Sequence, residues 1–376
     1  MHYLKKYFLF ILYTPALMAC SNPDIEKIQE SEEVNFEIDT VVTGLSIPWG
    51  MVWLPSGEML ITERGGEIRI FKDGALLEDR ISGLPTIYVH GQGGLLDIEL
   101  HPDYTSTGWV YISYSSGEGS SPNSGNTTLM RARLDGYQLV DKEVIFKAEP
   151  NTSKSQHFGG RIEFDRDGFL YLSIGDRGER NKAQDITTYN GSVFRLNDDG
   201  SIPSDNPFVS DNKAIGAIYS YGHRNPQGLA INPETGEIWS HEHGPKGGDE
   251  VNIIRKGNNY GWPEITYGVN YSGTTISEFT HKEGMEQPVT YWDPSIAPCG
   301  MTFVSGDKYP GWKGDLLVGS LKFNYIVRCD VNGNEIDSEE ILLDRIGRVR
   351  VIRQGPDGLI YIALEGKGLI IRLMPL

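Results

Sequence analysis

Short runs of alternating apolar and polar residues recur along the chain, and each run follows a turn that contains glycine. A period of two residues is typical of a β-strand, whereas little of the chain shows the 3.6-residue period of an amphipathic helix. The six clearest runs are LPSGEMLIT at Leu54, TGWVYISYS at Thr107, RDGFLYLSIG at Arg166, ETGEIWSHEHG at Glu234, KGDLLVGSLK at Lys313 and PDGLIYIALEG at Pro356. Their spacing of about 60 residues fits repeated four-stranded units with long loops.

The sequence therefore predicts an all-β fold, a six-bladed β-propeller with four-stranded antiparallel blades. Each blade would bury apolar side chains against the next, so the six units depend on one another. The segment from Val34 to Thr43 alternates like a strand and would close the ring by pairing with the last blade, after Ile360 to Leu373. A pair of β-sandwiches is the alternative, but the regular recurrence favours the propeller. Loops of a propeller converge at one end of its channel, where polar residues of separate blades would meet.

The N-terminus has the pattern of an export signal. Lys5 and Lys6 precede the short apolar run YFLFILY, and LMAC resembles a lipobox with cleavage before Cys20 and lipidation of its thiol. An ordinary signal peptide that happens to contain a cysteine is the alternative. Ser21 does not suggest retention at the inner membrane, so we expect a lipid-anchored protein of the bacterial cell envelope that faces the periplasm from the outer membrane. The predicted divisions are a lipoprotein signal peptide over 1–19, a flexible tether over 20–33 and the propeller over 34–376.

Composition limits the classes of function. The chain has 34 Lys and Arg against 51 Asp and Glu, which gives a net charge of −17. Because nucleic-acid binding needs clustered positive charge, a nucleic-acid surface is not expected. Besides Cys20, the cysteines are Cys299 and Cys329. An exported protein could join these two in a disulfide or keep them as buried thiols, and the sequence leaves both open.

Polar side chains gather in turns rather than in long strands. The main clusters are HGQGGLLDIELHPDY from His90, SQHFGGRIEFDRDGFLYLSIGDRG from Ser155, YGHRNPQGLAINPETGEIWSHEHGPKGGDE from Tyr221, and Lys322 with Arg348 and Arg350. Taken singly, each has an ordinary explanation, such as a solvated loop histidine or arginines that pair with carboxylates. Together, several cations around one point require an anion, and carbonyl oxygens suit a hard divalent cation. The pattern indicates a planar or carboxylated anionic ligand, a divalent metal and one candidate base, His157.

These motifs also resemble a known family. YGHRNPQGLA, HGPKGGDEVN, NNYGWP, GQGGLLD, SQHFGGRI, IGDRG and APCGMTF are similar to those of the soluble aldose sugar dehydrogenases that depend on pyrroloquinoline quinone (PQQ), in the glucose/sorbosone dehydrogenase family. The resemblance runs from about Thr43 to the C-terminus. It implies a six-bladed propeller that binds PQQ and calcium at the mouth of the channel. It also implies oxidation of aldose sugars at the anomeric carbon to the lactone. Since no C-x-x-C-H haem motif is present, electrons would pass to an external acceptor.

The resemblance assigns roles to individual residues. His157 would be the general base for the anomeric hydroxyl, and Arg224 would stabilise negative charge on the reduced quinone oxygen. For PQQ, the resemblance implies hydrogen bonds from Gln92 and Asn225, binding of the carboxylates by Lys322, Arg348 and Arg350, and packing by Tyr271. For calcium, it implies that the main-chain oxygens of Gly244 and Pro245 bind the catalytic ion. A second calcium would lie at Glu250 and Tyr260. Asp249 would support the calcium loop.

Two departures separate this chain from the glucose-oxidising branch of that family. Gln156 stands where that branch carries an acid, and His243 where it carries an amide, which puts strict glucose specificity in doubt. The alternative functions are a calcium-dependent sugar lactonase, which would need carboxylate and Asn metal ligands, and a non-catalytic propeller that binds a glycan or protein partner, which need not keep a base and cations together. Neither the physiological sugar nor the oligomeric state follows from the sequence.

Overall fold

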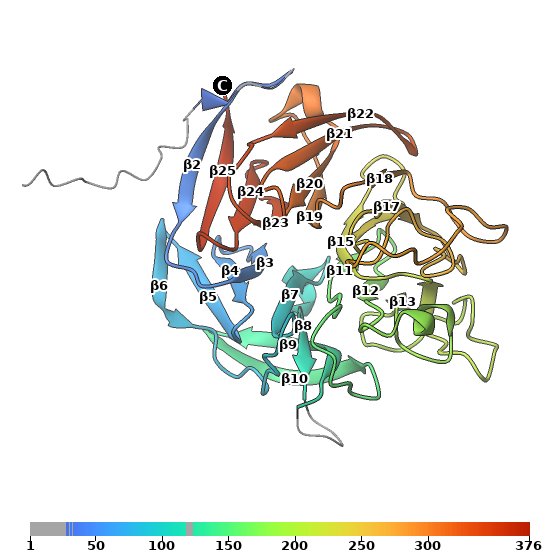
Figure 1. The fold of residues 1–376 in the computed structure, drawn as a ribbon. Helices are drawn as coiled ribbons and strands as arrows, with labels where there is room; N and C mark the ends of the chain where they lie inside the picture. Colours follow the sequence, from blue (N-terminus) through green and yellow to red (C-terminus); the bar gives the residue numbers. More distant parts are fainter. Residues whose placement is uncertain (1–27, 30, 32, 118–122) are drawn as a thin grey trace, which may run out of the picture.

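The fold is a β-propeller of six sheets around a central axis (Figure 1). The computed structural model describes residues 28–376 except 30, 32 and 118–122. The first three blades, from the innermost strand outward, are β3 (Pro48–Trp53), β4 (Met59–Glu63), β5 (Glu67–Lys72) and β6 (Ala75–Arg80); β7 (Leu95–Leu100), β8 (Val110–Ser116), β9 (Asn126–Asp135) and β10 (Gln138–Lys147); and β11 (Ile162–Phe164), β12 (Leu170–Ile174), β13 (Ser192–Leu196) and β14 (Ile218–Tyr221).

The other three blades repeat this antiparallel arrangement. They are β15 (Pro226–Ile231), β16 (Ile238–Glu242), β17 (Asp249–Ile254) and β18 (Thr290–Trp292); β19 (Pro298–Phe303), β20 (Leu316–Ser320), β21 (Ile326–Asn332) and β22 (Glu335–Leu342); and β23 (Val349–Gln354), β24 (Ile360–Leu364), β25 (Leu369–Pro375), β2 (Phe36–Val42) and β1 (Ile28–Gln29). The short helices are α1 (Tyr104–Thr107), η1 (Arg180–Gln184) and η2 (Pro310–Trp312). The predicted six-bladed fold with four-stranded antiparallel blades is confirmed.

The two ends of the chain close the ring. β2 pairs antiparallel with β25, with Ile38 opposite Leu373, as the alternation around Val34 to Thr43 predicts. β1 then pairs with β2, and the carboxylate of Glu33 lies 3.0 Å from the guanidinium of Arg328. These residues fall within the predicted tether, so contact with the propeller begins before the boundary placed at residue 34. Cys20 and the predicted signal peptide lie outside the described residues and stay predictions.

The second strands of the blades are more deeply buried than simple alternation suggests. β4, β12, β16, β20 and β24 are buried along their whole length. Both faces of each sheet pack against neighbouring blades, so a polar residue in these strands is not solvent-facing but must find a partner inside. Glu242 at the end of β16 and Ser320 at the end of β20 are of this kind.

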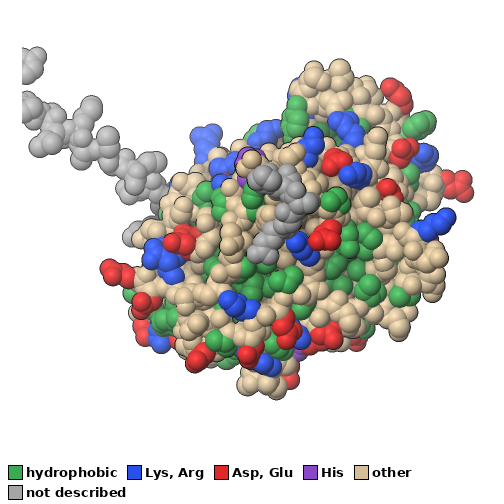
Figure 2. Space-filling model, turned by 90° about the horizontal axis from the view of Figure 1, so that it is seen from below, with side chains coloured by type: hydrophobic (Ala, Val, Ile, Leu, Met, Phe, Trp, Pro, Cys, Tyr) green, Lys and Arg blue, Asp and Glu red, His purple; other side chains and the backbone are tan. Residues whose placement is uncertain are grey.

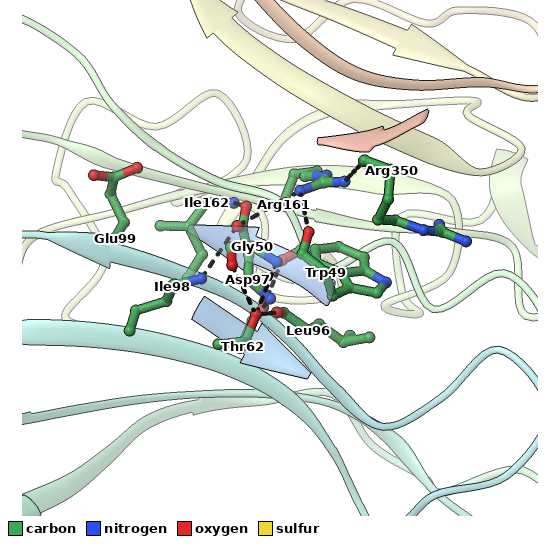
Figure 3. Close-up of polar contacts among 12 residues, drawn as sticks. Trp49, Gly50, Thr62, Leu96, Asp97, Ile98, Glu99, Arg161, Ile162 and Arg350 are labelled. Atoms are coloured by element: carbon green, nitrogen blue, oxygen red, sulfur yellow. Dashed lines mark hydrogen bonds and ion pairs between the residues drawn. The ribbon is translucent and has the colours of Figure 1, made fainter. Parts of the chain in front are cut away.

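One arginine joins the six innermost strands at the axis, and Figure 3 shows its contacts with Trp49, Asp97 and Arg350. Arg161, which directly precedes β11, is 3% exposed. It contacts one residue on each of the other five innermost strands: Trp49 on β3, Asp97 on β7, Gln227 on β15, Cys299 on β19 and Arg350 on β23. Its guanidinium donates to three main-chain oxygens at 2.8–3.3 Å and lies 3.5 Å from a carboxylate oxygen of Asp97. Arg161 therefore links all six blades.

The surface and the cysteines complete the description. On the face shown in Figure 2, basic and acidic side chains are interspersed over a largely uncharged surface. Cys299 and Cys329 are both buried free thiols, so the structure supports the second of the two alternatives for this pair. Within the described part of the chain, no helix has the length and apolar character needed to span a membrane.

Candidate active site

Two adjoining cavities lie among the loops at one end of the channel. The larger has a volume of about 670 Å³ and the smaller about 370 Å³, and Gln92, Pro245 and Tyr271 line both. Of the other residues predicted for the site, the larger cavity is lined by Asn225, Lys322, Arg348 and Arg350, and the smaller by His157 and Arg224. Side chains that are far apart in sequence thus meet as the propeller geometry predicts.

His157 sits on a loop held in an unusual backbone conformation. Its φ is +57°, in the left-handed region that non-glycine residues rarely adopt, and its main-chain N–H donates to Oε1 of Gln92 at 2.7 Å. The buried side chain of Arg177 fixes the same loop, because it donates to the carbonyl oxygens of Gln156 and Lys154. These contacts hold the loop in its left-handed conformation, and the imidazole lines the smaller cavity.

Asp176 is the direct partner of His157. The distance from Nδ1 of His157 to Oδ1 of Asp176 is 2.6 Å. The carboxylate also accepts hydrogen bonds from Nε1 of Trp262 at 2.9 Å and from the main-chain N–H of Gly178 at 2.6 Å. Burial alone would raise the pKa of Asp176, but the hydrogen bond with His157 and the nearby positive charges hold it below its usual value. Asp176 is therefore an ionised acceptor at neutral pH.

Burial lowers the pKa of His157 below its usual 6.5, and this outweighs the opposing hydrogen bond with Asp176. The positive charges of Arg224 and Arg177 lower it further. His157 is thus neutral at pH 7, with its Nδ1–H donating to Asp176, and Nε2 keeps a free lone pair. An imidazole in this state can accept a proton, which is the property needed in a general base.

Arg224 lines the smaller cavity and is 7% exposed. Its Nη1 donates to the carbonyl oxygens of His243 at 2.9 Å and of Gly244 at 2.8 Å. Its main-chain N–H donates to the carboxylate of Glu242, which is also bonded to Nδ1 of His223 at 2.9 Å. Both the backbone and the guanidinium of Arg224 are therefore fixed in position. Its Nε is buried without a partner among the described residues, so it is open to an additional acceptor.

The larger cavity has a strongly positive wall. The ammonium of Lys322 donates to the carbonyl oxygen of Ser295 at 2.9 Å, and Arg348 donates to that of Leu321 at 3.0 Å. Arg350 forms an ion pair with Glu365. Burial opposes ionisation of Glu365, but Arg350 holds the pKa of this carboxyl below its usual value. Glu365 also lies 3.7 Å from Arg348, so one carboxylate is shared by two arginines and the wall keeps a net positive charge.

The loop predicted to hold a metal is tied down by a buried carboxylate. Oδ1 of Asp249 accepts from the main-chain N–H of Gly244, and Oδ2 accepts from that of Ala297, both at 2.8 Å. This supports the structural role predicted for Asp249, whose pKa is raised to about 6 by burial. Pro245 lines both cavities. The carbonyl oxygen of Gly244 already accepts from Arg224 and keeps a second lone pair.

Glu250 and Tyr260 line neither of the two cavities. Burial and the neighbouring Glu242 raise the pKa of Glu250 to about 8. The phenol of Tyr260 donates to the carbonyl oxygen of Ile253 and accepts from the main-chain N–H of Arg255, so this side chain braces the end of β17. No group of three or more His, Cys, Asp or Glu suited to a metal occurs among the residues that the structure describes. A second calcium at Glu250 and Tyr260 stays a prediction.

Several residues of the site were not predicted. Asp176 stands in the motif IGDRG and Trp262 in NNYGWP, but neither motif reveals that Asp176 contacts His157 or that Trp262 donates to Asp176. Arg64, Trp49 and Glu365 line the larger cavity, but each lies in or directly after a strand with no distinguishing local pattern. Only the closed ring brings them to the same wall.

Comparison with known proteins identifies the family of the chain. A model of the family described as Glucose / Sorbosone dehydrogenase matches residues 45–372. The chain belongs to this family. The aldose sugar dehydrogenase YliI of Escherichia coli K12 is 42% identical over 345 residues, which cover 90% of this family member and 92% of that relative.

Solved structures of similar proteins share the fold of this chain. The apo-form of the soluble aldose sugar dehydrogenase from Escherichia coli has a TM-score of 0.87 at 39% identity, covering 91% of this chain and all of that one. The PQQ-bound aldose sugar dehydrogenase from Streptomyces coelicolor has a TM-score of 0.74 at 27% identity, covering 91% of this glucose/sorbosone dehydrogenase family member and 98% of that chain.

Proposed function

We propose that the protein is a PQQ- and calcium-dependent dehydrogenase that oxidises aldose sugars at the anomeric carbon to the lactone and passes electrons to an external acceptor. The observation that carries this proposal is the His157–Asp176 pair, 2.6 Å apart, in a cavity that adjoins a larger cavity with a positive wall. Relatives named as aldose sugar dehydrogenases, one of them in a PQQ-bound form, support the same activity.

The donors of the larger cavity fit PQQ, which is planar and carries three carboxylates. Five basic side chains line this cavity, and Glu365 pairs with two of them, Arg348 and Arg350; the others are Arg64, Lys246 and Lys322. The Nε atoms of Arg64 and Arg224 are buried without partners among the described residues, and such orphan donors are satisfied by an anionic ligand. Lys322, Arg348 and Arg350 would bind the carboxylates, Gln92 and Asn225 would hydrogen-bond the ring system, and Tyr271 would pack near it.

When bound, PQQ supplies a two-electron acceptor for the sugar. The residues of this chain prepare the sugar for that step. Nε2 of His157 would take the proton of the anomeric hydroxyl, and Asp176 would stabilise the resulting imidazolium through Nδ1. Arg224, fixed by the carbonyls of His243 and Gly244, would stabilise developing negative charge from its place in the wall of the smaller cavity. The main-chain oxygens of Gly244 and Pro245 would hold a calcium ion.

The alternative functions receive less support from the site. A calcium-dependent lactonase would bind its metal through several carboxylates, and no such group occurs among the described residues. A propeller that only binds a partner has no use for a buried carboxylate aligned with an imidazole in a cavity. The positive wall and the His157–Asp176 pair together favour redox chemistry on a sugar.

Reconstitution tests the proposal directly. The purified protein, depleted of metal by a chelator, is expected to reduce an artificial electron-accepting dye with several aldoses only after PQQ and calcium are added together. Calcium alone or PQQ alone should give little turnover. Lack of PQQ binding by absorbance titration, together with lack of turnover for every aldose, would reject the proposal.

Asp176→Asn is expected to lower kcat about 10- to 100-fold, because a carboxylate that orients a histidine makes it a better base. The Asp176 carboxylate raises the pKa of His157, so its loss should lower this pKa further. In the wild-type protein, kcat/KM should fall as the pH drops through the pKa of His157, below 6.5. In the variant this fall should occur at a still lower pH. An unchanged pH profile with unchanged kcat would contradict the role of Asp176.

A further inference from the structure

The two cavities carry more positive charge than PQQ can offset. They are lined by seven Lys and Arg side chains and by two carboxylates, Asp176 and Glu365, a surplus of five positive charges. This surplus occurs on a chain with a net charge of −17. A ligand with three carboxylates would offset three of the five, and a bound calcium ion would add to the remainder. The site is therefore electrostatically prepared for a further anion.

Arg180 is an exposed arginine that lines the smaller cavity. It begins η1, and its Nη2 donates to the side-chain oxygen of Asn270 at 3.1 Å. Its guanidinium lies 5.9 Å from the ring centroid of Trp262. No carboxylate lies within ion-pair distance of Arg180 in the part of the chain that the structure describes. Arg224, the other arginine of this cavity, is already bonded to two carbonyl oxygens.

The position of Arg180 relates it to the sugar rather than to the quinone. Arg180 lines only the cavity that contains His157, whereas the basic residues assigned to the PQQ carboxylates, Lys322, Arg348 and Arg350, line the larger one. Gln156, which lines the same small cavity, is uncharged, and the carboxylate of Asp176 is occupied by His157 and Trp262. A negative group on a sugar would therefore meet an available guanidinium and no free carboxylate.

We propose that the preferred substrates are aldoses that carry a carboxylate or phosphate away from the anomeric carbon, and that Arg180 binds this anionic group. The proposal rests on the aldose dehydrogenase activity proposed above and specifies its substrate class. With the anomeric hydroxyl at His157, the anionic end of the sugar would lie toward Arg180 and form a charge-assisted hydrogen bond. A guanidinium suits either oxyanion, because its planar donors can bind two oxygens at once.

The test compares matched sugars on the PQQ- and calcium-loaded protein. Glucuronate is measured against glucose for the carboxylate, and glucose 6-phosphate against glucose for the phosphate. In the wild-type protein, kcat/KM is expected to be higher for at least one anionic sugar than for glucose. Arg180→Gln should lower that ratio about tenfold, Arg180→Lys should retain most of it, and added salt should reduce it in the wild type. Calorimetric titration of these sugars into the protein without cofactor should give the same order of affinities.

Arg166→Gln is the matched control. Arg166 is an exposed arginine in the turn between β11 and β12, at the opposite end of the blade from His157, and its loss changes the net charge equally. It should leave the ratio unchanged. Equal kcat/KM for glucose and both anionic sugars in the wild type, or an unchanged ratio in Arg180→Gln, would overturn the proposal. Turnover of glucose with PQQ distinguishes this outcome from failure of the proposed dehydrogenase activity, in which no sugar reacts.

Discussion

Replacement of His157 by glutamine is expected to lower kcat by about 10² to 10⁴, the range contributed by a positioned general base. Glutamine keeps a polar side chain in the smaller cavity but cannot accept a proton near neutral pH. Because the basic residues assigned to the PQQ carboxylates line the larger cavity, the affinity for PQQ should change by less than about threefold. Stopped-flow mixing with sugar would measure the chemical step, and absorbance titration would measure PQQ binding.

The pH profile adds a second criterion for His157. The acid limb of kcat/KM, which reports protonation of this histidine, should be absent from His157→Gln. His281→Gln is the matched control, since His281 is exposed and lines neither cavity. It should keep wild-type kcat and the wild-type pH profile. Wild-type turnover by His157→Gln would refute the assignment of the base, whereas loss of PQQ binding would indicate that the variant disturbs the loop held by Gln92 and Arg177.

The architecture could be predicted because the propeller repeats in the sequence. Each turn glycine and the alternating strand after it, as at Gly168 and β12, specify one unit of the ring, and closure follows from a strand-like N-terminal segment. The depth of burial could not be predicted. Alternation indicates one buried face, but packing between blades buries both faces of strands such as β16. Polar residues there, including Glu242, therefore act as internal partners rather than as surface groups.

The site was predictable where a motif carries its chemistry locally. His157, Arg224 and the Gly244-Pro245 loop stand in distinctive stretches, and the structure brings them to adjoining cavities. Arg64 and Arg180 gave no such signal, because a single arginine in a loop is usually a solvated surface charge. Their significance arises only from position in space, which depends on how the closed ring orients each blade. For the same reason, the motif IGDRG does not by itself reveal that Asp176 contacts His157.

Arg161→Met is expected to destabilise the fold by about 3–5 kcal/mol, the cost typical of breaking a buried ion pair. Methionine fills much of the same space but donates no hydrogen bond. The main-chain oxygens of Trp49, Gln227 and Arg350 would each lose a charged donor. Asp97 would lose its contact with Arg161, and its nearest remaining cation would be Arg353, at 3.7 Å. Urea denaturation followed by tryptophan fluorescence would measure the change.

The control for Arg161 is an exposed arginine in a surface ion pair. Arg80 pairs with Glu67 at 2.9 Å, both side chains are about half exposed, and Arg80→Met should change stability by less than about 1 kcal/mol. Asp97→Asn combined with Arg161→Met should cost less than the sum of the single changes, because the two charges interact. Trp49 and Arg350 also line the larger cavity, so Arg161→Met should weaken PQQ binding as well. If Arg161→Met is no more destabilising than Arg80→Met, the six blades are held together by their apolar contacts alone, and the axial arginine does not link them.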